Sequence, residues 1–427
     1  MCSSDLSTVS GGWQARVDRL GLRASGQELA TLEARLGRLA GADQPVKAEG
    51  ALRLNLAEAV RQPAAAGRLA IAGGEANLKF GATLGTSRLV QAEVRLDRLR
   101  GGRPAADLPS VKADVRLEID PSGRIRFAAP IRLAAADRAS DVSLAGEFTP
   151  RPGAAGGRLD ARLAGGVLHA ADGEALAGVL AAPVPAEARA PAAVDAAVPP
   201  WAGWEGRIEV DLAEVIHDAA VRMRDIKGRV ELEAGKVRLE GLRGSLGDSG
   251  RATLSGALAF EAGRPEPFAA EVQVEVREFD PGPWFRVASG GAPATLEGAF
   301  TVSSRLRGRA ASVGGLAEAV SGEVLLSSRG GIFRGLPVKV ASAAAGGGRV
   351  AGLIAAAGNA LGSLTGRRDP PAIAGRAQAV TEFAAGISTI PFDQLSLVLT
   401  RDLARNLAVR EFTLIAPELR LSGAGTV

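Results

Sequence analysis

Apolar and polar residues alternate with a period of two through the stretch from Gly206 to Phe260, for example in Ile208–Leu212 and Val237–Glu240. This period directs every second side chain to the same face of a β-sheet. The breaks in the pattern, Glu233–Lys236 and Gly247–Gly250, carry the glycine and polar residues of hairpin turns. The stretch therefore predicts an antiparallel meander with one apolar face and one charged face.

The same alternation recurs on both sides of this stretch, in Leu52–Leu56, Val115–Ile119 and Leu395–Leu399. Asp120–Gly123 between two such segments is a strong turn signal, because proline presets one backbone dihedral and glycine accepts a positive φ. The predicted fold class is therefore mostly β, an elongated, curved antiparallel sheet (a β-groove) built from repeated meanders.

Short helices interrupt the predicted strands. Residues 57–66 predict a helical turn that ends near Pro63, and residues 313–320 predict a short helix. Residues 346–365 predict another helix, because Leu353, Ala357, Leu361 and Leu364 form one apolar stripe. Its apolar run is too short to span a bilayer, so a helix that caps the sheet is the interpretation we favour over a helix on a membrane surface.

Composition predicts one internal boundary. Residues 181–200 are rich in alanine and proline without periodicity, which is typical of an extended linker or surface loop. The predicted regions are an N-terminal antiparallel β region over residues 1–180 and a C-terminal region over 201–427. The second region contains a helical insertion at 338–365.

The apolar face of such a sheet has to be covered. A second sheet, closure into a barrel, or an apolar ligand held in a curved trough would each cover it. Aromatic residues make up only 4% of the 427 residues and tyrosine is absent, so small and medium aliphatic side chains line the face. Length and repetition favour the trough, which suits acyl chains because they need continuous apolar contact. A sandwich remains the alternative.

Residues that support catalysis or metal binding are scarce. His169 and His217 are the two histidines, and Asp218 beside His217 points to the opposite face of a strand. Cys2 is the single cysteine, so neither a disulfide framework nor a thiolate metal site is expected. The G-x-G-x-x-A string in Gly346–Ala351 lacks a preceding parallel strand. We therefore predict that the protein is not an enzyme and has no cofactor or metal.

The charges are nearly balanced, with 51 basic and 47 acidic residues and a formal net charge of +4. Arginines alternate with acidic residues along strands, and no basic patch with interleaved aromatic residues is present, so no nucleic-acid partner is expected. Residues 1–13 lack the basic flank and apolar run of a signal peptide or anchor. Their abrupt, strand-like character predicts a truncated chain.

Two patterns in the second half of the chain carry a family resemblance. The first joins Ser321–Leu326 to Gly330–Leu336, and the second runs through Pro391–Asp393, Leu395–Leu399, Leu407, Phe412–Leu414, Pro417 and Leu421–Gly425. Both resemble the C-terminal region of AsmA-like proteins. The Gly206–Phe260 meander, with its Leu242–Gly247 step, is similar to the strand units that those proteins repeat. The resemblance covers about the second half of the chain well, whereas the first half shares only the general strand pattern.

The resemblance implies a β-groove in the envelope of Gram-negative bacteria, anchored in the inner membrane and facing the periplasm. Members are implicated in phospholipid transport to the outer membrane and in envelope biogenesis. The implied partners are phospholipids, both membranes and envelope assembly proteins. The family's N-terminal membrane helix is not seen, and relatives continue beyond Gly425. We therefore expect a C-terminal fragment whose anchor lies in a missing segment. The family has no catalytic residues to transfer.

The principal functional hypothesis is a groove that binds and conducts phospholipid acyl chains. Its predicted lining consists of Val230, Leu232, Val237, Leu239, Leu254, Leu258, Val272, Val274, Val276, Leu296 and Phe300. The alternative is a structural or assembly scaffold for outer-membrane biogenesis, in which the apolar faces pack on each other. A surface adhesin of repeated sandwiches is a third hypothesis.

Overall fold

The computed structural model of the chain describes residues 3–9, 12–24, 26–39, 41, 43–62, 71–101, 108–153, 156–180, 198–199, 201–217, 221–283, 294, 296–334, 390–402, 406–417 and 419–426. The chain divides into two compact units. The N-terminal unit comprises Met1–Asp218 and Met223–Val237, and the C-terminal unit comprises Ala219–Arg222 and Arg238–Val427.

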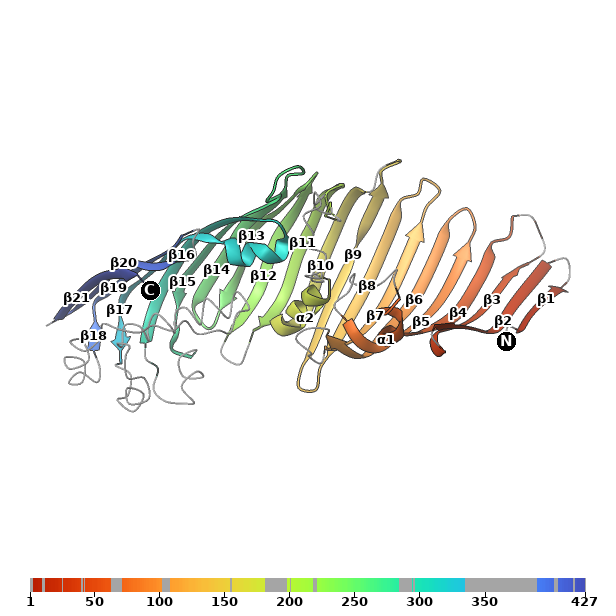
Figure 1. Cartoon of the computed structure of the whole chain (residues 1–427), viewed down its shortest axis with the longest axis horizontal. Helices are drawn as coiled ribbons and strands as arrows, with labels where there is room; N and C mark the ends of the chain where they lie inside the picture. The colour runs from red at the N-terminus through yellow and green to blue at the C-terminus, as the bar shows by residue number, and fades with distance from the viewer. Residues whose placement is uncertain are drawn as a thin grey trace. The chain divides into compact units, whose positions relative to one another are not determined.

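The N-terminal unit is an open sheet whose neighbouring strands follow the chain order (Figure 1). Its strands are β1 (Ser3–Val9), β2 (Gly12–Ala24), β3 (Gln27–Arg38), β4 (Val46–Asn55), β5 (Ile71–Leu84), β6 (Arg88–Gly101), β7 (Ser110–Ile119), β8 (Ile125–Ala134), β9 (Ala139–Pro150), β10 (Gly157–His169), β11 (Trp204–Ile216) and most of β12 (Arg222–Glu233). Each strand from β1 to β9 pairs antiparallel with the next. Two helices, α1 (Leu56–Ala59) and α2 (Ala170–Leu180), lie between strands.

The C-terminal unit is a second antiparallel array. Its strands are most of β13 (Lys236–Leu246), β14 (Gly250–Phe260), β15 (Phe268–Phe279), β16 (Leu296–Ala310), β17 (Ser321–Phe333), β18 (Ile390–Phe392), β19 (Gln394–Arg401), β20 (Leu407–Ala416) and β21 (Leu419–Thr426). From β14 to β17 consecutive strands pair, and β17 continues to β19, β20 and β21. The short strand β18 pairs with the end of β17.

The predicted fold class is confirmed in both units: curved antiparallel sheets built from meanders, with few and short helices. The predicted turn at Asp120–Gly123 forms, with Gly123 at φ +81° and the Asp120 carboxylate accepting from the Ser122 and Arg124 amides. Helix α4 (Val313–Ala319) matches the helix expected at 313–320, and Ser312 caps it. The helix expected at 346–365 lies outside the described residues, as does the rest of the 338–365 insertion.

One strand pair departs from the antiparallel pattern. Strands β10 and β11 are parallel, with Gly157 opposite Trp204 and His169 opposite Ile216. A parallel pair needs a crossover connection, and α2 stands at the start of this one. As a result, the predicted boundary at 181–200, which is almost entirely outside the described residues, falls within the N-terminal unit. The division into units comes later, between β11 and β13.

A buried carboxylate fixes α2 to the sheet. Asp172 is completely buried and accepts hydrogen bonds from Arg138 Nε at 2.8 Å and from Ser140 Oγ at 2.7 Å. The Ser140 hydroxyl in turn accepts from the His169 backbone amide at 2.9 Å. These contacts tie the first turn of α2 to the start of β9 and the end of β10, which satisfies a charge that burial alone would disfavour.

The core of the C-terminal unit contains a small aromatic cluster. Phe300 is fully buried, and its ring lies 6.4 Å from that of Phe279 and 6.3 Å from that of Phe392. Leu395 and Leu414, which are opposite each other on β19 and β20, are also buried. Aromatic pairs at these separations add to the stabilisation from burial. The chain's own side chains therefore fill the space around Phe300.

Replacing Asp172 with alanine should destabilise the N-terminal unit by about 1–3 kcal/mol, because it leaves the buried Ser140 hydroxyl and the partly buried Arg138 guanidinium without their acceptor. Urea unfolding followed by circular dichroism measures the change. Asp137→Ala is the matched control: that carboxylate also pairs with Arg138, at 3.5 Å, but its side chain is 81% exposed. We expect a change within about 0.5 kcal/mol there. Equal losses in the two variants would contradict the role of the buried carboxylate.

Candidate functional site

The apolar side chains of the N-terminal unit form continuous rows that cross the sheet perpendicular to the strands. One row takes one residue from each strand from β2 to β11: Leu20, Leu32, Leu52, Leu78, Val94, Ala113, Ile131, Val142, Gly165 and Leu212. We call it the Leu20 row. The Ala15 row runs parallel to it through Ala15, Leu36, Ala48, Ala82, Val90, Leu117, Phe127, Gly146, Ala161 and Ile208. Neither row contains a charged or polar side chain.

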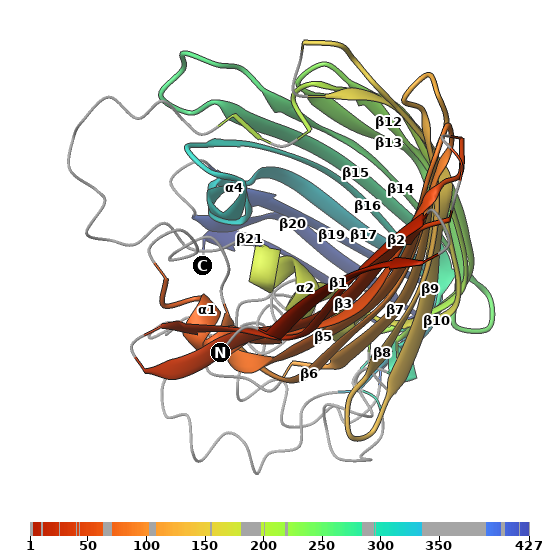
Figure 2. The same ribbon diagram turned by 90° about the vertical axis from the view of Figure 1, so that its right-hand side faces the viewer.

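These rows lie on the concave face of the sheet. Ser140, two residues before Val142 of the Leu20 row, occupies the same face because side chains alternate along a strand. Its hydroxyl contacts Asp172 of α2, and Figure 2 shows α2 on the concave side of the N-terminal unit, with α1 on the same side. The residues between the rows, including Arg53, Glu93 and Arg116, therefore face outward.

Much of this concave face is only half-buried. In the Leu20 row the residues from β3 to β10 are half-buried, Leu20 itself is 44% exposed, and Leu212 at the far end is buried. So long a run of apolar positions in contact with solvent is unusual, because burial of such area is the main favourable term in folding. Part of the apolar side chains on this face is thus exposed.

Part of the face is filled by the chain itself. Leu159, Ala161 and Leu232 are buried together, and Phe127, Leu144, Phe148, Trp204, Ile208, Val230 and Val237 pack against them. The rings of Phe148 and Trp204 are 5.5 Å apart. Three residues of the predicted lipid-contacting set, Val230, Leu232 and Val237, belong to this packed cluster.

The C-terminal unit places most of the other predicted residues on one apolar face. Leu254 is directly opposite Val274, and Val272 and Val276 are opposite Gly256 and Ala252. Leu258 is opposite Ala270 on the same strands, and Leu239 is half-buried on β13. The row through Ala252, Val276, Val302, Leu326, Leu397 and Phe412 crosses six neighbouring strands.

Two predicted residues have a different setting. Leu296 is 4% exposed and lies opposite Phe333, and Phe300 belongs to the buried aromatic cluster. Both contact the chain's own side chains. The prediction from sequence did not include the rows of the N-terminal unit, although their signal was the same alternation that was used for residues 206–260.

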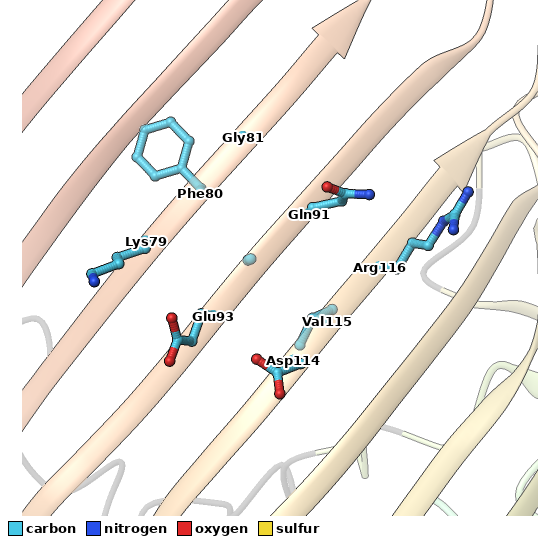
Figure 3. A pocket seen from close by; sticks show the side chains of 9 residues that line it. Lys79, Phe80, Gly81, Gln91, Glu93, Asp114, Val115 and Arg116 are labelled. Atoms are coloured by element: carbon cyan, nitrogen blue, oxygen red, sulfur yellow. The ribbon is translucent and has the colours of Figure 1, made fainter.

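The outward face carries shallow, charged hollows. One, of about 430 Å³, has Lys79, Glu93 and Asp114 along one side and Gln91 and Arg116 along the other (Figure 3). The hydrogen bond from Arg95, at 2.7 Å, and the nearby charge of Lys112 lower the pKa of the Glu93 carboxyl. A second hollow, of about 350 Å³, is lined from Arg16 to Phe80 and shares Lys79 and Phe80. Neither contains a residue of the predicted lipid-contacting set.

The described residues offer no set of three or more His, Cys, Asp or Glu side chains placed to hold a metal ion. His169 pairs with Ile216 in the parallel register, which puts His217 one residue beyond it at the same end of the sheet. The Gly346–Ala351 string lies outside the described residues. Within the described part of the chain, none of the helices has the length and apolar character required to cross a membrane.

A scan against protein-family models and searches of curated proteins and solved structures find no match to this chain. The geometry of the concave face is therefore the basis for its proposed function.

Gly50 tests how closely the concave face is packed. A Cβ at this position would lie 2.5 Å from the Glu33 carbonyl oxygen and 2.7 Å from Phe80 Cζ. Gly50→Ala should therefore lower the free energy of unfolding by about 1–3 kcal/mol. Gly81 is next to Phe80 but on the outward face, and a Cβ added there would have no atom within 4 Å. Gly81→Ala should therefore be neutral or stabilising by up to about 1 kcal/mol. Thermal unfolding of both variants measures this, and similar losses would contradict it.

Proposed function

We propose that the protein binds phospholipid acyl chains on the concave face of the N-terminal unit and on the apolar face of the C-terminal unit, and conducts them along the rows. The observation that carries the proposal is the unbroken Leu20 row, which crosses ten strands without a charged or polar side chain. Each methylene transferred from water to such a surface contributes about 0.8 kcal/mol. Binding needs no directional bonds, so a chain is able to slide from one strand to the next.

The length of the row supports movement rather than storage of one lipid. Ten strands spaced about 4.8 Å apart make a path of roughly 43 Å. An acyl chain in one leaflet spans about 15 Å, half of a hydrocarbon core of about 30 Å. The row therefore accommodates more than one chain end to end, as a conduit requires.

The resemblance to AsmA-like proteins supports a cellular location and role for this activity. In that setting the protein is a non-enzymatic component of the Gram-negative envelope. It faces the periplasm, is associated with the inner membrane, and passes phospholipids between the inner and outer membranes. Neither nucleic acid nor a cofactor takes part.

The packed cluster around Leu159 favours the second candidate function, a structural or assembly scaffold. There the chain covers its own apolar face with Phe127, Phe148 and Trp204, which leaves less surface for a ligand. A scaffold would retrieve envelope assembly proteins in a pull-down while carrying no phospholipid. A conduit would carry phospholipid without them.

A charge placed in a row should stop lipid passage. Leu78→Asp in the N-terminal unit and Val274→Asp in the C-terminal unit each put a carboxylate on the apolar face, where an acyl chain would have to desolvate it. We expect transfer of a fluorescent phospholipid between donor and acceptor vesicles to fall at least ten-fold, with the circular dichroism spectrum retained.

The matched controls place the same charge on the neighbouring outward position. Asn77→Asp and Gln273→Asp should leave transfer within two-fold of the unmodified protein. Native mass spectrometry of the unmodified protein should show co-purified phospholipid. Absence of lipid, under conditions in which a known lipid carrier retains it, would contradict the proposal.

A further inference from the structure

The concave face of the N-terminal unit has two unlike rims. At one rim, which we call the helix rim, the chain passes through α1 after β4 and through α2 after β10. Both helices lie on the concave side (Figure 2). At the other, the turn rim, β5 joins β6 through residues 85–87 and β7 joins β8 through residues 120–124. Among the described residues, the turn rim carries short turns where the helix rim carries helices.

Ion pairs lie at the helix rim. Asp172 pairs with Arg138 at 2.8 Å, and Glu58 pairs with Arg61 at 2.7 Å. Arg98 also forms an ion pair, with Glu75. A charged head group at Arg138 would have to displace the buried Asp172 carboxylate, which makes binding there unfavourable.

The turn rim has one register row on the concave face. It contains Trp13, Arg38, Val46, Leu84, Arg88, Ile119, Ile125, Phe148 and Leu159. Only two of these residues are charged, and both are arginines. This row stands beside the uncharged Ala15 row, so each guanidinium lies at the boundary between apolar surface and water.

The two arginines differ in their present contacts. Arg38 donates from Nη2 to the Gly41 carbonyl oxygen at 3.2 Å. Arg88 is exposed at the start of β6, beside Leu84, which is 40% exposed. Among the described residues Arg88 has no ion-pair or side-chain hydrogen-bond partner. A guanidinium offers donors in a planar fork that matches a phosphate group.

We propose that Arg88, with Arg38 as a second contact, binds the phosphate of phospholipids whose acyl chains lie on the apolar rows. The inference rests on the proposed function and adds to it the rim at which head groups lie and the residue that selects for phosphate. Three strand spacings separate the two arginines, about 14 Å, so they contact neighbouring head groups rather than one. From these head groups the acyl chains extend onto the adjacent apolar rows.

The test compares two fluorescent probes with identical acyl chains, a phosphatidic acid and a diacylglycerol that lacks the phosphate, on Arg88→Gln and on the control Arg53→Gln. Arg53 is also exposed and without an ion pair among the described residues, but it faces outward on β4. We expect Arg88→Gln to weaken phosphatidic acid binding about ten-fold, which corresponds to about 1.4 kcal/mol, and to leave diacylglycerol binding within two-fold. Arg53→Gln should change neither.

The outcomes separate this inference from the proposed function. Suppose that the unmodified protein binds both probes, and that Arg88→Gln weakens the binding of both equally or of neither. The proposed phosphate contact is then wrong, while the proposed binding of acyl chains is retained. If the unmodified protein binds neither probe, both proposals fall. Glycerol 3-phosphate, which has the phosphate but no acyl chains, serves as a competitor. If it displaces phosphatidic acid at a concentration similar to that of the lipid, the site binds free phosphate and the assignment to a lipid is overturned. Circular dichroism and thermal unfolding confirm that both variants are folded.

Discussion

The register between neighbouring strands is the constraint on which the rest of this structure depends. Each strand alternates apolar and charged residues, but a continuous apolar surface exists only because the apolar positions of ten strands are aligned with one another. A slip of one residue in any pair would exchange the two faces of the strand. Arg53 or Arg95 would then stand in the Leu20 row. Cross-strand burial of the aliphatic side chains penalises such a slip, and short turns such as Asp120–Gly123 set the register locally.

The helices give this sheet its asymmetry. A parallel pair between β10 and β11 requires a crossover, and the crossover begins with α2 on the concave side. The buried contacts of Asp172 with Arg138 and Ser140 hold it there. Because α1 is at the same end of the strands, one rim of the concave face carries helices and the ion pairs of Asp172, Glu58 and Glu75. The other rim carries turns and two arginines in an otherwise apolar row. The concave face is thus bounded by a helix rim on one side and a turn rim with two arginines on the other.

Open and filled regions coexist on the apolar face. From β3 to β7 the Leu20 row remains half-buried, whereas Phe127, Phe148 and Trp204 fill the face near β8 to β12. In the C-terminal unit, Phe279, Phe300 and Phe392 form a second filled region. Both filled regions are built around aromatic side chains, whereas the accessible part is lined mainly by aliphatic side chains together with Phe80. This distribution is consistent with a ligand-binding surface bounded by packed segments.

The sequence by itself determined the fold class, the turn at Asp120–Gly123 and the short helix near 313–320, because period-two alternation and turn chemistry act over a few residues. It also assigned Leu254 and Val274 to the same apolar face, but it did not show that they form a cross-strand pair. Only the tertiary structure decided which strands pair, that β10 and β11 are parallel, and that Leu296 and Phe300 are core residues. It also decided that Arg88 lies at a rim while Arg53 faces outward. Those distinctions depend on register and on the face of the sheet, which are set by contacts between residues far apart in the chain, so alternation within one strand does not reveal them.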